Sequence, residues 1–223
     1  MSPESTGTPR LVLASQSPRR RELLERIGCR PDVRPVDADE SVGPGEKARD
    51  LVQRLARTKA TAIEVGPDEV VVAADTEVAL DGTSFGKPAD LADAAAMLRR
   101  LSGRPHQVHT GVAVRLGDRI AVGVSDVTVV MRPLDEALID WYLSTGEPLG
   151  KAGAYALQGA GGLLVRSLEG SPDAVVGLPL ALVDELAAEV GVELRDLTHG
   201  TASNGPASNG TASNGTASNG ATP

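Results

Sequence analysis

The sequence predicts an α/β or α+β domain in which helices flank a largely buried sheet. Strand-like and helix-like segments alternate along most of the chain. Residues 70–74 (VVVAA) form a short, continuous apolar run that is typical of a buried strand. With 223 residues and 41% hydrophobic content, the chain can bury a substantial core, so we expect one folded domain.

The first predicted elements are a strand at residues 11–14 and a helix that begins soon after it. Ser17 is a suitable N-cap, and Pro18 suits the first helical position because no backbone N–H is needed there. Gly28 suits the position just past the helix end. The sequence therefore marks both ends of this helix.

The later elements follow from hydrophobic periodicity and turn residues. A helix over about residues 45–64 carries an apolar stripe of Leu51, Val52, Leu55, Ala56 and Ala60. Two paired strands, 107–115 and 120–131, flank a turn at Gly117-Asp118. The remaining predictions are a strand at 32–36, helices at 89–101, 134–144 and 179–189, and a glycine-rich loop at 150–162 that makes a close approach.

Both ends of the chain are predicted to lie outside the folded domain. Residues 1–9 contain no apolar core, and from residue 201 onward the chain repeats Ala-Ser-Asn-Gly without charges or large apolar side chains. Such segments cannot bury enough surface to offset the entropy cost of ordering. We therefore expect a disordered N-terminus at 1–9, a folded domain at 10–198 and a disordered tail at 199–223.

The composition restricts the partners and the compartment. The formal net charge is −8 and only 2% of the residues are aromatic, so we expect no nucleic-acid partner. No apolar run is long enough to span a bilayer and no secretory signal is visible, which favours a cytoplasmic protein without a membrane partner. Cys29 is the only cysteine, and we expect it to pack in the core.

Three consecutive arginines, Arg19 to Arg21, open the first predicted helix. The positive end of the helix macrodipole disfavours each cation there by roughly 0.3–1 kcal/mol, so the cluster needs a compensating anion. Free backbone N–H groups at the same place also bind phosphate. The alternative is a solvated basic patch. On an acidic chain, such a local cluster matches a small anionic ligand better than a polymer.

Acidic side chains that follow predicted strands are candidates for catalysis. Asp75 and Thr76 come directly after the buried strand 70–74, and open α/β sheets place ligand crevices at the carboxyl ends of their strands. Alternatively, Asp75 caps a turn. The acidic run 37–40, which ends at Glu40, offers oxygen ligands that suit Mg²⁺ held jointly with a substrate phosphate, or it is an exposed turn.

Two lysines and two histidines are further candidates. Lys87 lies in Gly86-Lys87-Pro88, where it could reach a phosphate or could be an ordinary surface residue. Lys59 lies late in a predicted helix, where a cation complements the negative helix end. His106 and His109 are three residues apart on a predicted strand and point to opposite faces, so we assign both to structural roles.

Several short motifs follow one another in a fixed order along the chain. The opening one is LASQSPRRRELL at residues 13–24. The others are Asp39-Glu40, Arg54-Leu55-Ala56 with Lys59, Ala74-Asp75-Thr76, Gly86-Lys87-Pro88, Leu101-Ser102-Gly103, Val108-His109-Thr110-Gly111, AGAYALQG at 152–159 and VGLPL at 176–180. In this order they resemble the motifs of the Maf family of nucleoside triphosphate pyrophosphatases, over about residues 10–195.

The resemblance implies hydrolysis of a nucleoside triphosphate to the monophosphate and pyrophosphate, with a divalent cation, Mg²⁺ or Mn²⁺, as cofactor. By its place in the motifs, Asp75 would be the general base that activates a water for attack on the α-phosphorus. Glu40 would position the metal, with Asp75 or through waters. The side chains that would hold the triphosphate and offset its charge are Ser15, Arg19, Arg20, Lys59 and Lys87.

Three positions separate the branches of this family. Arg19, Thr76 and Gln158 resemble the branch that acts on dTTP and UTP. A sister branch that favours 7-methyl-GTP usually has tryptophan, glutamine and glutamate at these positions. An amide such as Gln158 can both donate and accept, which suits the imide edge shared by uracil and thymine. The resemblance therefore implies a pyrimidine nucleotide as substrate.

The family also implies a fold and an assembly. The expected fold is an elongated α/β fold with a mixed, curved sheet flanked by helices and a central cleft, similar to the inosine triphosphatase fold; the expected assembly is a homodimer. A non-catalytic nucleotide-binding regulator of septum formation is the alternative function, but Asp75 and Lys87, whose loss would favour it, are both present. A P-loop enzyme is disfavoured because the chain has no Gly-x-x-x-x-Gly-Lys-Ser/Thr motif.

Overall fold

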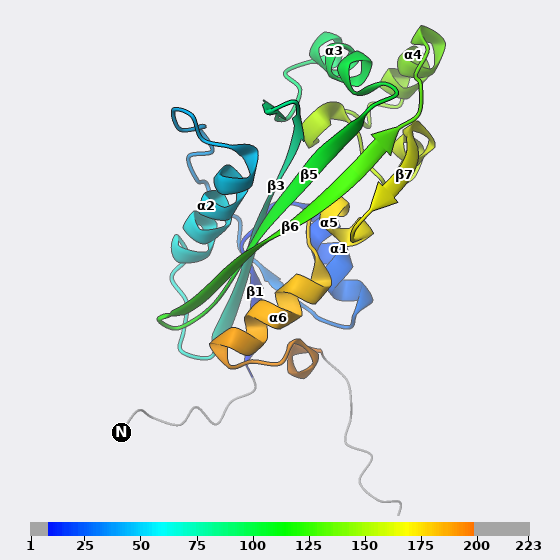
Figure 1. The fold of residues 1–223 in the computed structure, drawn as a ribbon. Coiled ribbons are helices and arrows are strands. Elements are labelled where there is room, and N and C mark those ends of the chain that lie inside the picture. Colours follow the sequence, from blue (N-terminus) through cyan, green and yellow to red (C-terminus); the bar gives the residue numbers. More distant parts are fainter. Residues whose placement is uncertain (1–8, 199–223) are drawn as a thin grey trace, which may run out of the picture.

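The computed structural model describes residues 9–198, so the predicted tail and all but the last residue of the predicted N-terminal segment lie outside the described part. Figure 1 shows the order of the elements. The strands are β1 (Arg10–Leu13), β2 (Asp32–Val33), β3 (Glu69–Leu80), β4 (Thr83–Phe85), β5 (Pro105–Leu116), β6 (Arg119–Met131) and β7 (Val165–Glu169). The α-helices are α1 (Pro18–Arg26), α2 (Ala48–Thr61), α3 (Leu91–Leu101), α4 (Glu136–Ser144), α5 (Pro172–Val176) and α6 (Leu180–Val190), and the 3₁₀ helices are η1 (Ala152–Ala154), η2 (Gly159–Leu164) and η3 (Leu194–Leu197).

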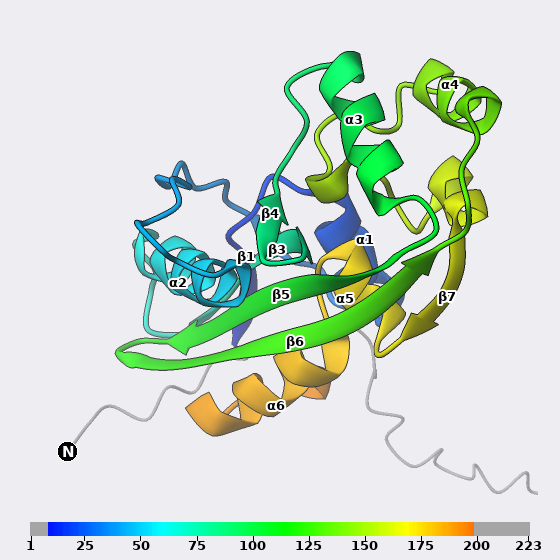
Figure 2. The ribbon, with the colours of Figure 1, turned by 45° about the horizontal axis from the view of Figure 1, so that its top comes forward.

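The described strands form a seven-stranded sheet in the order β2-β1-β3-β5-β6-β7, with β4 paired to β3 off this path. β2, β1 and β3 are parallel, whereas β3, β5, β6 and β7 pair antiparallel. The long strands β5 and β6 bend across the molecule (Figure 2). These observations confirm the predicted α/β fold with a mixed, curved sheet flanked by helices.

Side chains of β3 alternate between two faces of the sheet, and different helices cover each face. Val70 and Val72 belong to a core that includes α1 and α6, whereas Val71 and Ala73 pack in a core with α2. Figure 1 shows α2 and α6 on opposite sides of the sheet. The apolar stripe predicted for α2 is buried as expected: Leu51, Val52, Leu55, Ala56 and Ala60.

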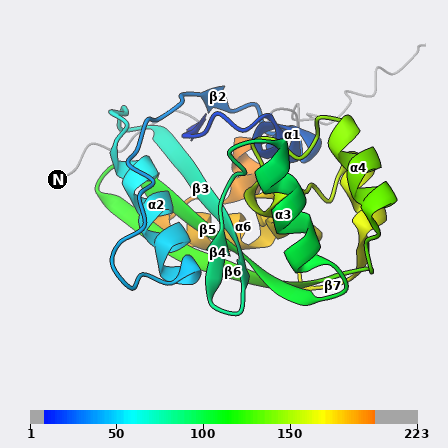
Figure 3. The same cartoon turned by 90° about the horizontal axis from the view of Figure 1, so that it is seen from above.

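A further core lies along the second half of β3. Val78 and Leu80 pack there with side chains of α3 and α4, which lie at the other end of the molecule from α2 (Figure 3). The polar residues 75–77 separate this core from the one that contains Ala74. The long strands therefore connect two lobes, and the polar residues 75–77 lie at the boundary between these lobes.

The prediction that the strand ends at Ala74 is wrong. β3 continues to Leu80 because residues 75–77 keep their backbone pairing with β5. Residues 75–77 are polar because their side chains lie between two hydrophobic cores, and the strand continues through them. The strand that ends at this level is β1, whose last paired residue, Leu13, lies opposite Val72. Asp75 thus lies just beyond the carboxyl end of β1, where ligand crevices form.

Helix α1 begins and ends as predicted, but its first turn is not capped by a side chain. Ser17 precedes the helix, Pro18 is its first residue, and Gly28 has a φ of 87° just past its end. The side chain of Ser17 makes no cap hydrogen bond. The backbone N–H of Ser17 donates to Oγ of Ser15 at 3.2 Å. The helix therefore begins next to a serine that belongs to the predicted site.

Four short elements outside the loop 150–162 are absent from the sequence predictions. β7 and α5 have five residues each, η3 has four and β4 has three, which is too short for a clear hydrophobic period. The predicted loop at 150–162 contains η1 and most of η2. The other predicted elements are present, although α2 is shorter than the predicted range 45–64.

The residues assigned to structural roles have such roles. His106 is buried and its Nε2 lies 2.8 Å from the hydroxyl of Tyr155, while Nδ1 of His109 lies 2.7 Å from Asp126. Cys29 is buried, and burial raises the pKa of its thiol. No helix among residues 9–198 combines the length and the apolar character needed to cross a membrane.

Candidate active site

A cavity of about 830 Å³ opens at the boundary between the two lobes. The start of α1, the middle of β3, the segment after β4 and the loop before η2 all contribute to its walls. It is lined by every residue that the sequence analysis proposes for the site: Ser15, Arg19, Arg20, Glu40, Lys59, Asp75, Thr76, Lys87 and Gln158. The fold thus brings together residues that are up to 143 positions apart in the chain.

Lys59 links two carboxylates at one side of the cavity. Its Nζ donates to Oδ1 of Asp75 and to Oε1 of Glu40, each at 2.6 Å, and the residue is only 7% exposed. A buried cation needs such partners, because an unpaired charge is costly in the interior. Complementing the negative end of α2 is therefore only part of what Lys59 does.

Glu40 also faces the exposed amine of Lys87, with Oε2 and Nζ 3.5 Å apart. Burial alone would raise the pKa of Glu40, but the hydrogen bond and charge of Lys59, together with Lys87, bring that pKa below its usual value. The two aspartates of the acidic run 37–40 differ in position. Asp37 lines the cavity, whereas Asp39 accepts the backbone N–H of Ser41 at 2.9 Å and does not line it.

Arg20 is held by neutral groups only. Its guanidinium donates to Oγ of Ser15 at 3.0 Å, to Oγ1 of Thr76 at 3.2 Å and to the carbonyl oxygen of Gly177 at 2.8 Å. Burial lowers the pKa of Arg20, and the charge of Asp75 opposes that effect. A partly buried guanidinium without a carboxylate on its nitrogens is well placed to bind an anion.

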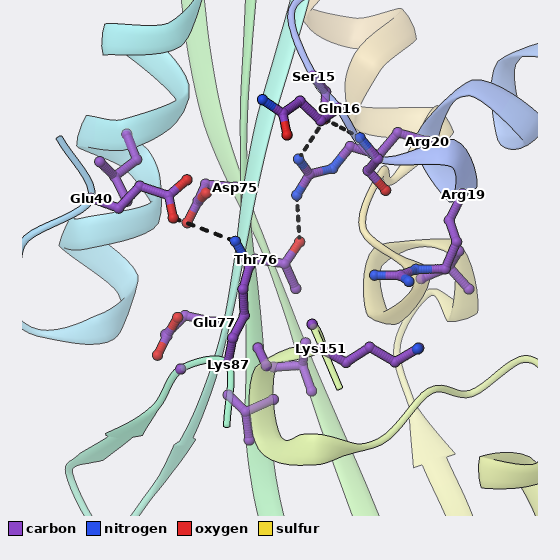
Figure 4. Close-up of a pocket in the computed structure, with 18 of the residues that line it drawn as sticks. Ser15, Gln16, Arg19, Arg20, Glu40, Asp75, Thr76, Glu77, Lys87 and Lys151 are labelled. Carbon is purple, nitrogen blue, oxygen red and sulfur yellow. Dashed lines mark hydrogen bonds and ion pairs between the residues drawn. The ribbon is translucent and has the colours of Figure 1, made fainter. Parts of the chain in front are cut away.

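Arg19 and Lys151 extend this cationic side of the cavity. No hydrogen-bond or ion-pair partner of the Arg19 guanidinium is present within residues 9–198. The Lys151 amine donates to the backbone carbonyl of Glu147, and burial, followed by the charge of Arg19, lowers its pKa. Figure 4 places Arg19, Arg20 and Lys151 opposite Glu40 and Asp75. Arg21 instead points to solvent, where it pairs with Glu25.

Sequence reasoning does not identify Lys151 or Glu77 as cavity residues. Glu77 lines the cavity two positions after Asp75 on the same face of β3, and its Oε1 accepts the hydroxyl of Ser84. Burial raises the pKa of Glu77, and the charges of Asp75 and Glu40 add to the effect. The period of two would have identified Glu77 if the strand had been extended past Ala74.

The loop that carries Gln158 is held by a partly buried carboxylate. Glu147 accepts hydrogen bonds from the hydroxyl of Tyr142 at 3.0 Å and from the backbone N–H groups of Ala160 and Gly161 at 2.9 Å each. The predicted close approach occurs here, because a Cβ at Gly161 would lie 2.2 Å from the carbonyl oxygen of Ala156. The amide of Gln158 is thereby presented to the cavity by a tightly packed loop.

The acidic side of the cavity has the chemistry of a shared magnesium site. Mg²⁺ is usually held by one or two carboxylates together with substrate phosphates. Glu40 and Asp75 offer two carboxylates on one wall. Within residues 9–198 no group of three or more such side chains is arranged to hold a metal ion by itself. Glu40 and Asp75 are therefore the side chains that could hold such a cation, jointly with oxygens of another molecule.

The fold and the cavity together define a class of protein. It is an α/β protein with a cleft between two lobes, and cationic side chains line one side of this cleft while carboxylates line the other. Residues 10–190 match the sequence profile of the family described as Maf-like protein, and the chain belongs to this family.

Several curated relatives are similar over nearly their whole length. A dTTP/UTP pyrophosphatase of Anaeromyxobacter dehalogenans is 55% identical over 83% of this chain and 96% of the relative. Proteins of the same name from Myxococcus xanthus and Chromobacterium violaceum are 49% and 47% identical, and cover 82% and 85% of this chain and 94% and 99% of their own.

Among solved structures, a nucleoside-triphosphatase, also titled dITP/XTP pyrophosphatase, from Mycobacterium abscessus aligns with 81% of this chain and 98% of its own. The sequence identity is 15% and the TM-score is 0.41. The family assignment rests on the sequence matches.

Proposed function

We propose that this protein hydrolyses dTTP and UTP to the nucleoside monophosphate and pyrophosphate. The observation that carries the proposal is that carboxylates and cations line opposite sides of the cavity. Asp75, which is held by Lys59, lies opposite Arg19, Arg20 and Lys151, and none of these three cations has a carboxylate partner among residues 9–198. Relatives named dTTP/UTP pyrophosphatase, 46–55% identical to this chain, support the substrate class.

The proposed reaction is attack by a water molecule on the α-phosphorus. Asp75 takes a proton from the water while the water oxygen forms a bond to the α-phosphorus. The bond from that phosphorus to the oxygen bridging to the β-phosphorus breaks, and pyrophosphate leaves with the electron pair. Arg19, Arg20 and Lys151 line the side of the cavity that would offset the charge of the triphosphate.

Lys59 and Lys87 support this chemistry from the acidic side. Lys59 holds the carboxylates of Asp75 and Glu40 in fixed positions through its two hydrogen bonds. The amine of Lys87 belongs to a side chain that is 64% exposed at the cavity wall, where it can contact a phosphate oxygen. These contacts prepare the base before the substrate enters.

We propose a divalent cation, Mg²⁺ or Mn²⁺, as cofactor. Glu40 and Asp75 are the side chains that would hold it, jointly with oxygens of the substrate. A bound divalent cation would neutralise phosphate charge and polarise the phosphorus. The preference for pyrimidines is proposed to involve Thr76, Arg19 and the amide of Gln158, which line the same cavity.

Two further properties, the assembly and the compartment, are proposed. The family resemblance supports a homodimer, which the molar mass measured by light scattering would test. The single, buried cysteine, which cannot form an intramolecular disulfide, supports a protein of a reducing compartment such as the cytoplasm. Localisation of the tagged full chain in cells would test that assignment.

The test of the proposed function is a product analysis. The purified chain is incubated with UTP, dTTP, CTP, GTP or 7-methyl-GTP, with Mg²⁺, Mn²⁺ or a chelator, and the products are separated by chromatography. We expect UMP, dTMP and pyrophosphate, and no turnover with the chelator. Orthophosphate alone would identify a phosphatase instead. Nucleotide binding without turnover would support the non-catalytic regulator.

A further inference from the structure

A buried threonine lies directly behind the cavity residue Thr76. Thr110 is fully buried in β5, opposite Thr76 in β3. Its Oγ1 lies 3.0 Å from Oγ1 of Thr76 and 2.8 Å from the carbonyl oxygen of Ala174 in α5. Thr76 lines the cavity, whereas Thr110 does not. A hydroxyl outside the cavity therefore contacts one of its walls.

The chemical nature of the partners sets the direction of each hydrogen bond. A carbonyl oxygen only accepts, so the single proton of Thr110 is donated to Ala174. Thr110 can then only accept from Thr76. A guanidinium only donates, so Thr76 also accepts from Arg20, at 3.2 Å. The donors thus point in one direction, from Arg20 through Thr76 and Thr110 to Ala174.

We infer that Thr110 is a positioning residue that makes Thr76 a hydrogen-bond acceptor towards the substrate. The proton of Thr76 is engaged with Thr110 and one of its lone pairs with Arg20, which leaves one lone pair for the cavity. A ligand acceptor at this place would meet that lone pair, or would have to take the proton away from a buried oxygen. The substrate group that faces Thr76 is therefore a donor.

This inference rests on the proposed function and extends it to base selection. dTTP and UTP both carry an imide N–H and a sugar hydroxyl as donors. Thr76 is one of the residues proposed above for the pyrimidine preference, and of these two donors only the imide N–H differs between bases, so we assign it to Thr76. Cytosine has almost the same shape, but its corresponding ring nitrogen is an acceptor. The fixed hydroxyl thus favours uracil and thymine over cytosine.

The test compares UTP and CTP in the variant Thr110→Val, which removes the hydroxyl and keeps the branched shape. Thr76 can then turn its proton towards the ligand. We expect the ratio of kcat/KM for UTP to that for CTP to fall about three- to tenfold, the effect of one hydrogen bond. Both substrates are measured on one preparation, so a loss of folded protein cancels from the ratio.

Two matched variants separate this role from a general effect on packing. Thr110→Ser keeps the hydroxyl and is expected to retain the UTP to CTP ratio. Thr128→Val makes the same chemical change in β6, where the hydroxyl contacts Gln107 outside the cavity, and is also expected to retain it.

The outcomes distinguish this inference from the proposed function. An unchanged ratio in Thr110→Val, with UTP hydrolysis intact, overturns the role of Thr110 and leaves the function standing. If the wild-type chain does not hydrolyse UTP, the function fails, and the same comparison is made with dissociation constants of UTP and CTP measured by calorimetry. A binding ratio that is equal in wild type and Thr110→Val then overturns the inference as well.

Discussion

The amine of Lys59 lies 2.6 Å from Oδ1 of Asp75, in a pair whose side chains are 8% and 13% exposed. The same amine contacts Glu40 at the same distance, so one lysine of α2 fixes two carboxylates at the wall of the cavity. Asp75 itself lies in β3, between the cores of the two lobes. The contact between Lys59 and Asp75 therefore links α2 to β3 at the wall of the cavity, where the proposed general base lies.

Replacing Arg19 by alanine separates ligand binding from stability. No partner of its guanidinium is present within residues 9–198, so we expect the free energy of unfolding to change by less than about 0.5 kcal/mol. Loss of a charged contact to the triphosphate raises KM for UTP at least about tenfold. Arg21→Ala, on the solvent side of α1, is the control. A normal KM for Arg19→Ala would remove Arg19 from the substrate site.

Gly177→Ala is expected to damage stability and substrate binding together. Gly177 has a φ of 122°, and an added Cβ would lie 3.3 Å from Oγ1 of Thr76 and 3.4 Å from Nε of Arg20. We expect a loss of about 1–3 kcal/mol in the free energy of unfolding from backbone strain, and a higher KM because Arg20 is displaced.

The control for this variant is Gly117→Ala, in the turn between β5 and β6. Gly117 has a φ of 58° and no atom within 4 Å of an added Cβ. It is expected to lose stability with an unchanged KM. Equal KM values for the two variants would show that the surroundings of Gly177 do not matter for binding.

Glu147→Gln tests how the loop with Gln158 is held. The carboxylate accepts three hydrogen bonds, from Tyr142, Ala160 and Gly161. The amide NH₂ of glutamine would face a backbone N–H, leaving a buried donor without an acceptor at a cost of about 1–3 kcal/mol. We expect a lower melting temperature and a higher KM for UTP. A melting temperature equal to that of wild type would contradict this account of the loop.

Glu69 makes the stability of the β1, β2 and β3 region sensitive to acid. Hydrogen bonds from Arg34, then from the backbone of Gly66, lower the pKa of Glu69 from 4.5 to about 2, and the charges of Arg34 and Arg10 add to them. Because the pKa is lower in the folded state, this stabilisation is present above about pH 4.5 and is lost as the pH falls towards about 2.

The variant Glu69→Gln checks the sign of this effect. We expect it to be less stable than wild type to urea at neutral pH, and the difference to shrink as the pH falls from about 4.5 towards about 2. Glu185→Gln, on the exposed face of α6, is the control and should match wild type throughout. A difference that grows as the pH falls would contradict the lowered pKa of Glu69.

The residues of the cavity could be predicted because their ordered motifs resemble those of the Maf family, and some of them also carry local signals. Ser15 and Arg19 stand at a helix start that is marked by Pro18 and Gly28, and Asp75 follows a strongly apolar run. The sequence does not say where that strand ends, because its length depends on pairing with residues of β5 that lie 28 to 46 positions further along the chain. This explains both the wrong strand end and the omission of Glu77.

Other features depend on contacts that no local pattern encodes. The pairing of Lys59 with Asp75 needs the packing of α2 on β3, and the helix position alone suggested only a favourable end charge. The role inferred for Thr110 depends on the register of β3 and β5 and on α5, which is too short to predict. Glu147 acts on a loop 13 and 14 residues away.

Oxygen labelling tests whether Asp75 activates a water for attack on the α-phosphorus of UTP. Wild type and Asp75→Asn are each incubated with UTP and Mg²⁺ in water labelled with heavy oxygen, and the products are analysed by mass spectrometry. We expect label in UMP and none in pyrophosphate, with turnover at least about a hundredfold lower in Asp75→Asn and UTP still bound. Label in pyrophosphate, or near-normal turnover of Asp75→Asn, would contradict this mechanism.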